Sequence, residues 1–253
     1  MNLVHFLHRF KFLRRLAKAL AGNVVLKQKF RDGYIFLNAV DHSWAWTGKL
    51  NYNTFDAGLQ NYIYKVSTNY ACFVDIGSNI GVMTIGTLLE NKQIKALAID
   101  ANADAIKLLK KSLKHNKLAD RCEVINAVVG NADGSIKFDG TGSVIGHVSE
   151  NGIDTPLLSL AGILNRFNHQ KTLVKIDVEG YETQFINELT KVNHLENFEI
   201  LIELHPLNFN EIGDPEYVLA AVKKLNATIK DLHGNDIASV QKDAFTQMVI
   251  KFN

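Results

Sequence analysis

Short apolar runs alternate with amphipathic segments through the chain after residue 70. The apolar runs cover residues 71–76, 94–99, 122–125, 172–176, 198–204, 227–230 and 246–252. Apolar positions recur with helical spacing near residues 80–90, 103–116, 180–189 and 215–225. Near-continuous apolar strands joined by helices are typical of an α/β fold, in which helices cover both faces of a parallel sheet. No helical segment separates the last two runs, so we expect the final strand to be antiparallel.

Two regions depart from this alternation. Residues 32–69 are rich in aromatic residues and asparagine, with a short predicted strand at Gly33–Leu37 and a predicted helix near 56–68. We therefore divide the chain into an N-terminal extension, residues 1–69, and a main domain, residues 70–253. The segment 130–156 is rich in glycine, and Ser135–Phe138 could form one strand of a hairpin. A long glycine-rich insertion of this kind is interpreted as a surface loop or a lid.

The first residues form an amphipathic pattern of their own. Apolar residues between positions 3 and 20 recur at steps of three and four, with basic residues between them, which predicts a helix. This helix either packs its apolar stripe on the body or docks on an anionic membrane surface or a partner. The scattered basic residues do not fit a signal peptide. We expect a cytoplasmic protein, with contact at a membrane surface as the alternative.

Composition narrows the choice of protein class. The 253 residues are 47% hydrophobic, which suits one large globular domain or a domain with an extension. Two cysteines are too few for a disulfide framework or a structural zinc site. The net charge of +2 conceals an asymmetry, because residues 1–31 hold eight Lys or Arg and no acid, leaving 20 basic against 26 acidic residues. An acidic body is unlike a nucleic-acid reader, so we expect no nucleic-acid partner.

Four of the apolar strands end in a carboxylate. These carboxylates are Asp75, Asp100, Asp177 and Glu203. In an open parallel sheet, ligands bind beyond the carboxyl ends of the strands. We therefore expect the four acids to line one rim of the sheet and to contact a ligand there.

A glycine-rich turn follows the first of these strands. Gly77 and Gly81 allow a tight turn and a close approach to a ligand. The pattern is not the G-x-G-x-x-G motif of dinucleotide sites, because Asn79 stands where that motif has glycine. An acid at position 100 can accept hydrogen bonds from both ribose hydroxyls. A nucleoside without a pyrophosphate is indicated, and S-adenosylmethionine fits, since a carboxylate rim also favours its sulfonium cation.

A second cluster of polar residues follows the later strands. Asp177 and Glu179 lie directly after one strand, and Glu203 and His205 close the next. We take Asp177 as the base or the anchor of the acceptor, assisted by His205 or Glu203, and Glu179 as a substrate contact. His205 is a base candidate because imidazole titrates near neutral pH. A divalent cation held by Asp177, Glu203 and His205 is an alternative that we do not favour.

With these residues in view, the chain resembles the FkbM-type S-adenosylmethionine-dependent methyltransferases over roughly residues 70–205. The nine residues Val174–Glu182 look like the family's Lys-Ile-Asp-Val-Glu-Gly-x-Glu signature, Phe73–Gly81 is similar to its first cofactor motif, and Asn126–Gly130 resembles the segment after its third strand. Two positions depart from the family. Asp100-Ala101 replaces the usual Glu-Pro, and Ala161 stands where an aspartate is usual.

The resemblance implies a fold, a reaction and a set of contacts. The fold would be a Rossmann-like seven-stranded sheet with a reversed terminal hairpin, and the reaction a methyl transfer to oxygen, often on a sugar or polyketide-like acceptor. Asp100 would hold the ribose, and Asn126 and Ala127 would flank the adenine. The methionine part would be held by Asp75, Gly77, Ser78, Asn79 and Gly81.

Three alternatives remain from the sequence. An NAD-dependent oxidoreductase would need the dinucleotide glycine pattern, which is not met. A non-catalytic protein could keep the fold and use the basic N-terminal helix to dock on a membrane or partner. A nucleic-acid methyltransferase would be favoured by an Asn-Pro-Pro-Tyr-like strand end, which the sequence lacks.

Overall fold

The computed structural model describes residues 24–46, 48–139, 147–148, 152–178, 182–205, 215–240 and 245–253. Two sequence-based predictions lie outside these ranges. They are the amphipathic helix within residues 3–20 and the substrate contact at Glu179. Within the described ranges, no helix has the length and apolar character needed to cross a membrane.

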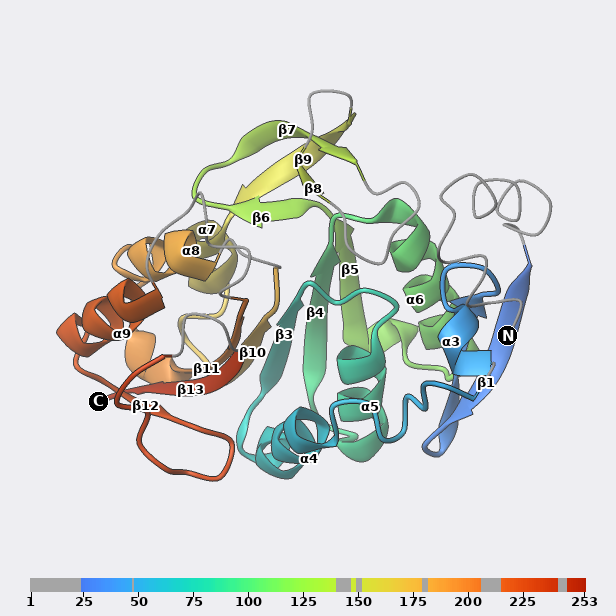
Figure 1. Ribbon diagram of the computed structural model, residues 1–253, viewed down its shortest axis with the longest axis horizontal. Coiled ribbons are helices and arrows are strands. Elements are labelled where there is room, and N and C mark those ends of the chain that lie inside the picture. The colour runs from blue at the N-terminus through green and yellow to red at the C-terminus, as the bar shows by residue number, and fades with distance from the viewer. Residues whose placement is uncertain are drawn as a thin grey trace.

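A seven-stranded sheet forms the centre of the molecule (Figure 1). Its strand order is β12-β13-β11-β10-β3-β4-β5. The bounds are β3 Cys72–Ile76, β4 Lys95–Asp100, β5 Cys122–Asn126, β10 Thr172–Ile176, β11 Phe198–Leu204, β12 Ala227–Lys230 and β13 Thr246–Phe252. Neighbouring strands run parallel except β13, which is antiparallel to both β11 and β12. The predicted parallel sheet with a reversed last strand is therefore confirmed.

Helices cover both faces of this sheet, as the apolar runs predicted. One face packs against α4 Ala57–Val66, α5 Val82–Glu90 and α6 Ala103–His115. The other packs against α7 Leu160–Asn165, α8 Glu182–Leu189 and α9 Pro215–Lys224. The start of α6 is fixed by the Asn102 side chain, which accepts hydrogen bonds from the backbone of Asp104 and Ala105.

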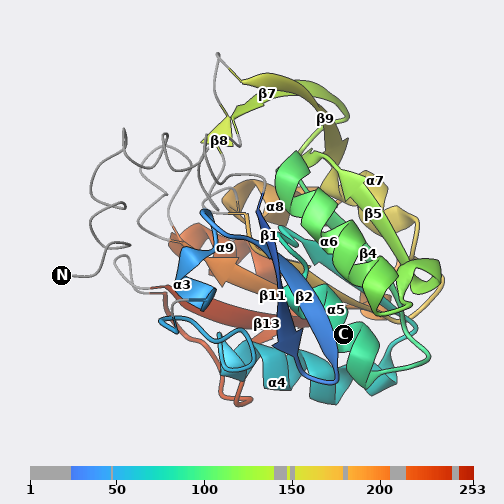
Figure 2. The ribbon, with the colours of Figure 1, turned by 90° about the vertical axis from the view of Figure 1, so that its right-hand side faces the viewer.

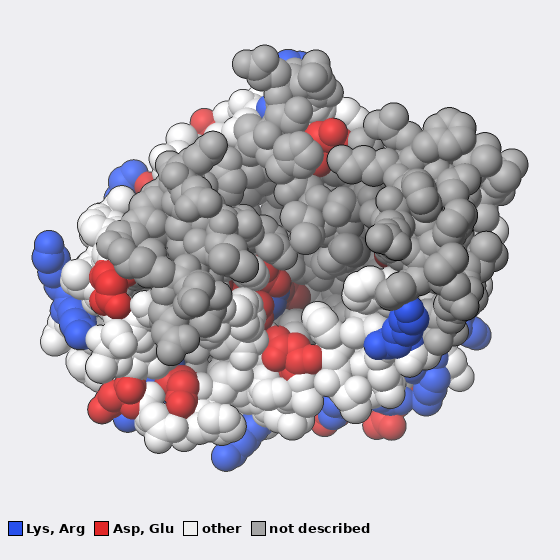
Figure 3. Space-filling view, in the orientation of Figure 1, with Lys and Arg blue, Asp and Glu red and all other residues white. Residues whose placement is uncertain are grey.

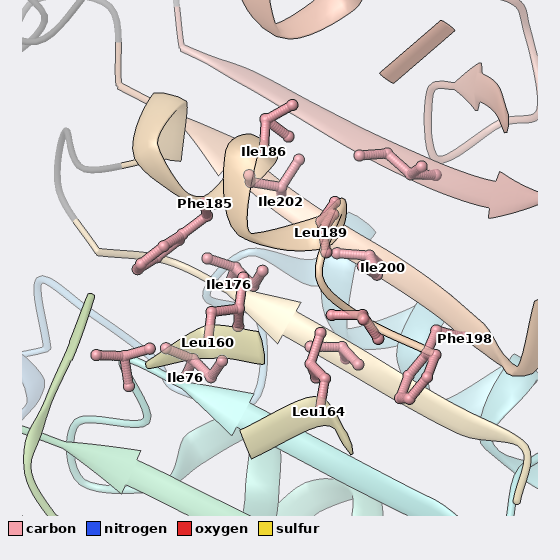
Figure 4. Packing of buried hydrophobic residues seen from close by; sticks show 14 of the residues in the cluster. Ile76, Leu160, Leu164, Ile176, Phe185, Ile186, Leu189, Phe198, Ile200 and Ile202 are labelled. Carbon is pink, nitrogen blue, oxygen red and sulfur yellow. The ribbon is translucent and has the colours of Figure 1, made fainter. Parts of the chain in front are cut away.

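Alternate residues of each strand enter the two hydrophobic layers. On β3, Phe73 points into the layer under α4–α6, whereas Val74 and Ile76 point into the layer under α7–α9. Figure 4 shows the second layer, where Phe185 of α8 lies near Ile176 of β10. All five residues of β3 and of β10 are buried, so these central strands hold the rim of the sheet rigidly in place.

The first described residues of the N-terminal extension form a hairpin. β1 Val25–Phe30 pairs antiparallel with β2 Gly33–Asn38, and a short helix, α3 Ser43–Trp46, precedes α4. The predicted strand at 33–37 and helix near 56–68 are confirmed, whereas β1 was not expected. Phe30 and Ile35 are fully buried in the same hydrophobic cluster as Phe73 of the main sheet. The boundary at residue 69 stays a prediction.

The glycine-rich region forms a second, four-stranded sheet of order β6-β9-β7-β8. Its strands are β6 Val128–Gly130, β7 Gly134–Asp139, β8 His147–Val148 and β9 Ile153–Ser159. The predicted strand at Ser135–Phe138 is confirmed. The prediction of a surface loop is wrong for the described residues of the segment, which form a sheet, and the lid alternative stays a prediction. The loop prediction fails because β7 and β9 pair antiparallel from Gly134↔Leu157 to Phe138↔Ile153, which satisfies backbone groups that a loop would leave to solvent.

Candidate functional site

Strand order gathers the four predicted acids on one edge of the sheet. β11, β10, β3 and β4 are consecutive neighbours, and their carboxyl ends carry Glu203, Asp177, Asp75 and Asp100. Figure 3, in the orientation of Figure 1, shows acidic side chains beside a hollow near the centre of the molecule. The structure therefore brings together the acids that the sequence predicted for a common rim.

The turn after β3 can be built only with glycine at position 77. Gly77 has φ +75°, a conformation that side chains disfavour, and an added Cβ would lie 1.8 Å from the carbonyl oxygen of Asp177. The backbone N–H of Asp177 donates to the carbonyl of Ile76 at 3.1 Å, which holds the two strand ends together. Asn79 and Gly81 also have positive φ values, 49° and 84°. The predicted glycine-rich turn is therefore a tightly fixed surface beside Asp177.

Two buried polar atoms of this region have no hydrogen-bond partner among the described residues. They are Oδ1 of Asp75 and Oγ of Ser78. The other oxygen of Asp75 accepts a hydrogen bond from Thr84 Oγ1 at 2.6 Å. Burial raises the pKa of Asp75, and the nearby ammonium of Lys175 opposes that shift. Buried polar atoms are usually paired, so these two are the atoms that a polar ligand would satisfy.

Asp100 ties the turn to the following helix. Its Oδ2 accepts from the backbone N–H of Asn79 at 2.7 Å, and its Oδ1 accepts from that of Asn102 at 2.7 Å. Burial raises the pKa of Asp100 to about 6, against the effect of these two hydrogen bonds. Each carboxylate oxygen keeps a second lone pair that can accept from a ligand. Asp100 thus supports the loop and keeps acceptor capacity for a ligand, and its ribose contact stays a prediction.

Asn126 and Ala127 lie beside Asp100 at the end of β5. The Asn126 side-chain amide donates to the carbonyls of Asp100 and Ala101, both at 2.9 Å. The backbone N–H of Ala127 donates to the carbonyl of Asp100 at 3.1 Å, and Ala127 is 1% exposed. These contacts hold the ends of β4 and β5 together, so the two predicted adenine neighbours adjoin the predicted ribose contact.

Lys175 connects the two halves of the rim, and our sequence analysis did not identify it. Its Nζ lies 3.1 Å from Asp177 Oδ2, 3.7 Å from Asp75 Oδ1 and 3.3 Å from the carbonyl oxygen of Gly77. Burial alone would lower the pKa of Lys175, but the carboxylates of Asp177 and Asp75 raise it above its ordinary value. A lysine inside the mostly apolar strand β10 was the available sequence signal.

Three candidate chemical groups converge next to Lys175. Ligand atoms of Asp177, Glu203 and His205 all lie within 4.8 Å of one another, and His205 Nε2 is 3.8 Å from Asp177 Oδ1. A carboxylate beside an imidazole can orient it for proton transfer. The same three residues could hold a divalent cation, but the ammonium of Lys175 already lies against Asp177 and opposes a second positive charge.

Burial sets the protonation of Glu203. This side chain is 7% exposed, and burial raises its pKa to about 7, while Lys175 opposes the shift and Asp177 adds to it. Gln247 of β13 donates to Glu203 Oε1 at 3.4 Å and to Asp56 Oδ2 at 2.8 Å. Burial raises the pKa of Asp56 as well. The extension and the reversed strand therefore each add a polar group to the site, and neither was foreseen.

Comparisons with known proteins identify the fold that carries this site. Residues 46–140 match the family described as "Methyltransferase small domain". A solved complex of aTrm5 with tRNALeu is 15% identical, with a TM-score of 0.50 over 90% of this chain. P. horikoshii TYW2 in complex with MeSAdo is 12% identical, with a TM-score of 0.50 over 96% of this chain and 83% of its own. No curated protein matches the sequence.

These findings correct one expectation and leave another open. This chain spans 53% of the length of aTrm5, whose complex contains tRNA. A fold shared with a tRNA-bound protein gives no ground for excluding nucleic acid, so our exclusion was wrong. We had excluded nucleic acid from the net charge of the body, but a net charge does not show where the charges lie on the surface. The FkbM family is not identified by the comparisons. The chain has the Rossmann-like methyltransferase fold.

Proposed function

We propose that this chain transfers a methyl group from S-adenosylmethionine to a hydroxyl oxygen. The observation that carries the proposal is a pair of buried oxygen atoms that make no hydrogen bond among the described residues, Asp75 Oδ1 and Ser78 Oγ, beside a turn that only glycine allows. Buried atoms of this kind are satisfied by a polar ligand. An amino acid moiety joined to a nucleoside suits a site in which Asp100 lies on the neighbouring strand end.

The chain's own residues divide into a cofactor side and an acceptor side. On the cofactor side, Asp75, Ser78 and the turn at Gly77 would hold the methionine part, and Asp100 the ribose hydroxyls. When bound, the cofactor supplies an electrophilic methyl group. Glycine at position 77 keeps the backbone close to Asp177. The acceptor would therefore bind next to the methionine part. Much of the rate in such a displacement comes from this positioning.

On the acceptor side, proton transfer is assigned to the groups that lie together. Asp177 anchors the acceptor hydroxyl, and His205 receives its proton, since Nε2 lies 3.8 Å from Asp177 Oδ1. Glu203, whose pKa is raised to about 7 by burial, titrates in the range where such a reaction runs. Lys175 keeps Asp177 in place from the opposite side, through Oδ2. A metal ion has no required part in this scheme.

The chemical class of the methyl acceptor is proposed from the FkbM resemblance alone. That resemblance favours a saccharide or polyketide-like hydroxyl. The alternative of an NAD-dependent oxidoreductase has less support, because Asn79 occupies the place of the second motif glycine and leaves less room for a pyrophosphate.

The proposal is tested with tritiated S-adenosylmethionine and a panel of acceptors. The panel contains methyl glycosides, hydroxylated aromatic compounds and RNA, and label in the product is localised by mass spectrometry. We expect label on a hydroxyl oxygen, and we expect the Asp177→Asn variant to bind S-adenosylhomocysteine normally while losing turnover. Transfer to nitrogen or carbon would refute the oxygen assignment, and failure to bind the cofactor would refute the whole proposal.

A further inference from the structure

A group of exposed lysines covers one flank of the molecule. Figure 2 shows β1, β2 and α6 side by side on the face turned toward the viewer, and Figure 3 shows Lys and Arg gathered at the lower right edge, near β1 in Figure 1. Five exposed lysines of β1 and α6 are called the lysine patch: Lys27, Lys29, Lys110, Lys111 and Lys114. The patch lies outside the rim described above.

Aromatic rings hold three of these ammonium groups in place. Lys27 Nζ and Lys29 Nζ lie 4.7 Å and 5.0 Å from the ring centroid of Tyr34, and Lys111 Nζ lies 4.7 Å from that of Phe36. A cation over an aromatic face is attracted to it by the negative charge of the ring face. These side chains therefore lose less conformational freedom on binding an anion than free lysines would.

The hairpin and the helix form one continuous surface. Ser112 Oγ accepts from the backbone N–H of Phe36 at 3.0 Å, and Asn116 Oδ1 accepts from that of Tyr34 at 2.9 Å. The ring of His115 meets Tyr34 and Phe36 edge-on, with centroid distances of 5.3 Å and 5.4 Å. The lysines of the two elements thus keep fixed positions relative to each other.

The patch carries uncompensated positive charge. Within the described part of the chain, no carboxylate forms an ion pair with any of its five lysines. Lys110 and Lys114 lie one helical turn apart, and Lys107 and Lys111 have the same spacing. Like charges at this spacing repel each other and weaken a helix. Two lysines of the basic N-terminal segment and three lysines of α6 therefore gather positive charge on this flank without an ion-pair partner among the described residues.

We propose that the lysine patch binds the phosphodiester backbone of a nucleic-acid strand. Lysines neutralise phosphates without reading sequence, and this contact supplies most of non-specific nucleic-acid affinity. A membrane surface fits less well, because binding there also needs apolar side chains to insert. None of the described large hydrophobic side chains that are exposed belongs to α6; on the hairpin only Val25, 37% exposed, is among them.

This inference goes beyond the proposed methyl transfer and does not depend on it. Binding of a nucleic-acid strand to the lysine patch can be measured without cofactor or acceptor. If no such binding occurs, the methyltransferase proposal still stands. The two are also separate in charge, since the patch is basic whereas four carboxylates line the rim.

The test uses the full chain and a fluorescein-labelled 20-nucleotide RNA of mixed sequence, with a DNA strand of the same sequence in parallel. The patch variant carries Lys27→Gln, Lys111→Gln and Lys114→Gln. The control variant carries Lys65→Gln, Lys223→Gln and Lys224→Gln, three lysines that are also exposed and lie on α4 and α9. Fluorescence anisotropy is recorded from 50 to 200 mM KCl, and circular dichroism checks that both variants fold.

We expect the patch variant to bind RNA at least about tenfold more weakly, and the control within about twofold of wild type. Loss of three phosphate contacts should reduce the slope of log affinity against log salt by about 2, at about 0.7 per contact on a single strand. Equal loss in both variants, or wild-type affinity in the patch variant, would overturn the proposal. The proposal would also be overturned if the wild-type chain, but not the patch variant, sedimented with phosphatidylserine vesicles while neither bound RNA or DNA.

Discussion

Replacing Glu203 with glutamine tests the electrostatics of the acceptor side directly. Burial raises the pKa of Glu203 from 4.5 to about 7, which means that the folded protein holds this carboxyl protonated over a range where the unfolded chain ionises it. Below pH 4.5 both states carry the proton, and above about pH 7 both have lost it. Stability therefore falls as the pH rises from about 4.5 to about 7.

The size of the effect follows from the two pKa values. The difference between 4.5 and about 7, at about 1.4 kcal/mol per pH unit, corresponds to about 3 kcal/mol of unfolding free energy. Solvent screening reduces this little, because the side chain is 7% exposed. Glutamine resembles the protonated acid and does not ionise. The Glu203→Gln variant should thus equal wild type near pH 4.5 and exceed it by about 3 kcal/mol at pH 8.

Urea unfolding at pH 4.5, 6 and 8 measures this difference. The matched control is Glu123→Gln, because Glu123 is exposed and its pair with Arg166 is worth at most about 1 kcal/mol. A Glu203→Gln variant whose stability relative to wild type does not change between pH 4.5 and 8 would refute the assigned burial effect.

Three further substitutions probe the rim. Gly77→Ala should abolish cofactor binding, because its Cβ would lie 1.8 Å from the Asp177 carbonyl oxygen, whereas Gly48→Ala, at a similar φ of +76° with no atom within 4 Å, should keep it; calorimetry compares them. Lys175→Met should cost about 3–5 kcal/mol in urea unfolding, because it leaves Asp177 and Asp75 without their buried partner; a loss under 1 kcal/mol would contradict this. Asp177→Asn should lower kcat by about 100-fold or more with cofactor Kd nearly unchanged; normal turnover in steady-state assays would remove its role.

The main sheet could be predicted because its signals are local. Fully buried strands such as β3 and β10 appear in the sequence as runs of mostly apolar residues, and the helices between them show their own spacing. The carboxylates at the strand ends could be placed on one rim because parallel strands end at the same edge. β1 was missed because its residues Val25–Phe30 alternate with lysines, which we counted as a basic arm.

Other parts of the site could not be predicted because they arise from contacts between distant segments. Gln247 bridges Asp56 and Glu203, which are far apart in sequence and meet only through the reversed strand and the N-terminal extension. Lys175 gave a signal as a charged residue inside an apolar strand, but its partners are known only once β3 and β10 are paired. The lysine patch could not be predicted, because the net charge of a chain does not show where its charged side chains lie on the surface.

The central claim is that the turn after β3 and Asp100 on β4 hold a nucleoside-linked amino acid. Calorimetric titration with S-adenosylhomocysteine tests it most directly, with Asp100→Ala as the variant and Asp104→Ala, an exposed acid in the first turn of α6, as the control. We predict one site per chain, an affinity at least about tenfold weaker in Asp100→Ala, and no change in Asp104→Ala. Absence of binding to the wild-type chain, or equal binding by Asp100→Ala, would contradict the claim.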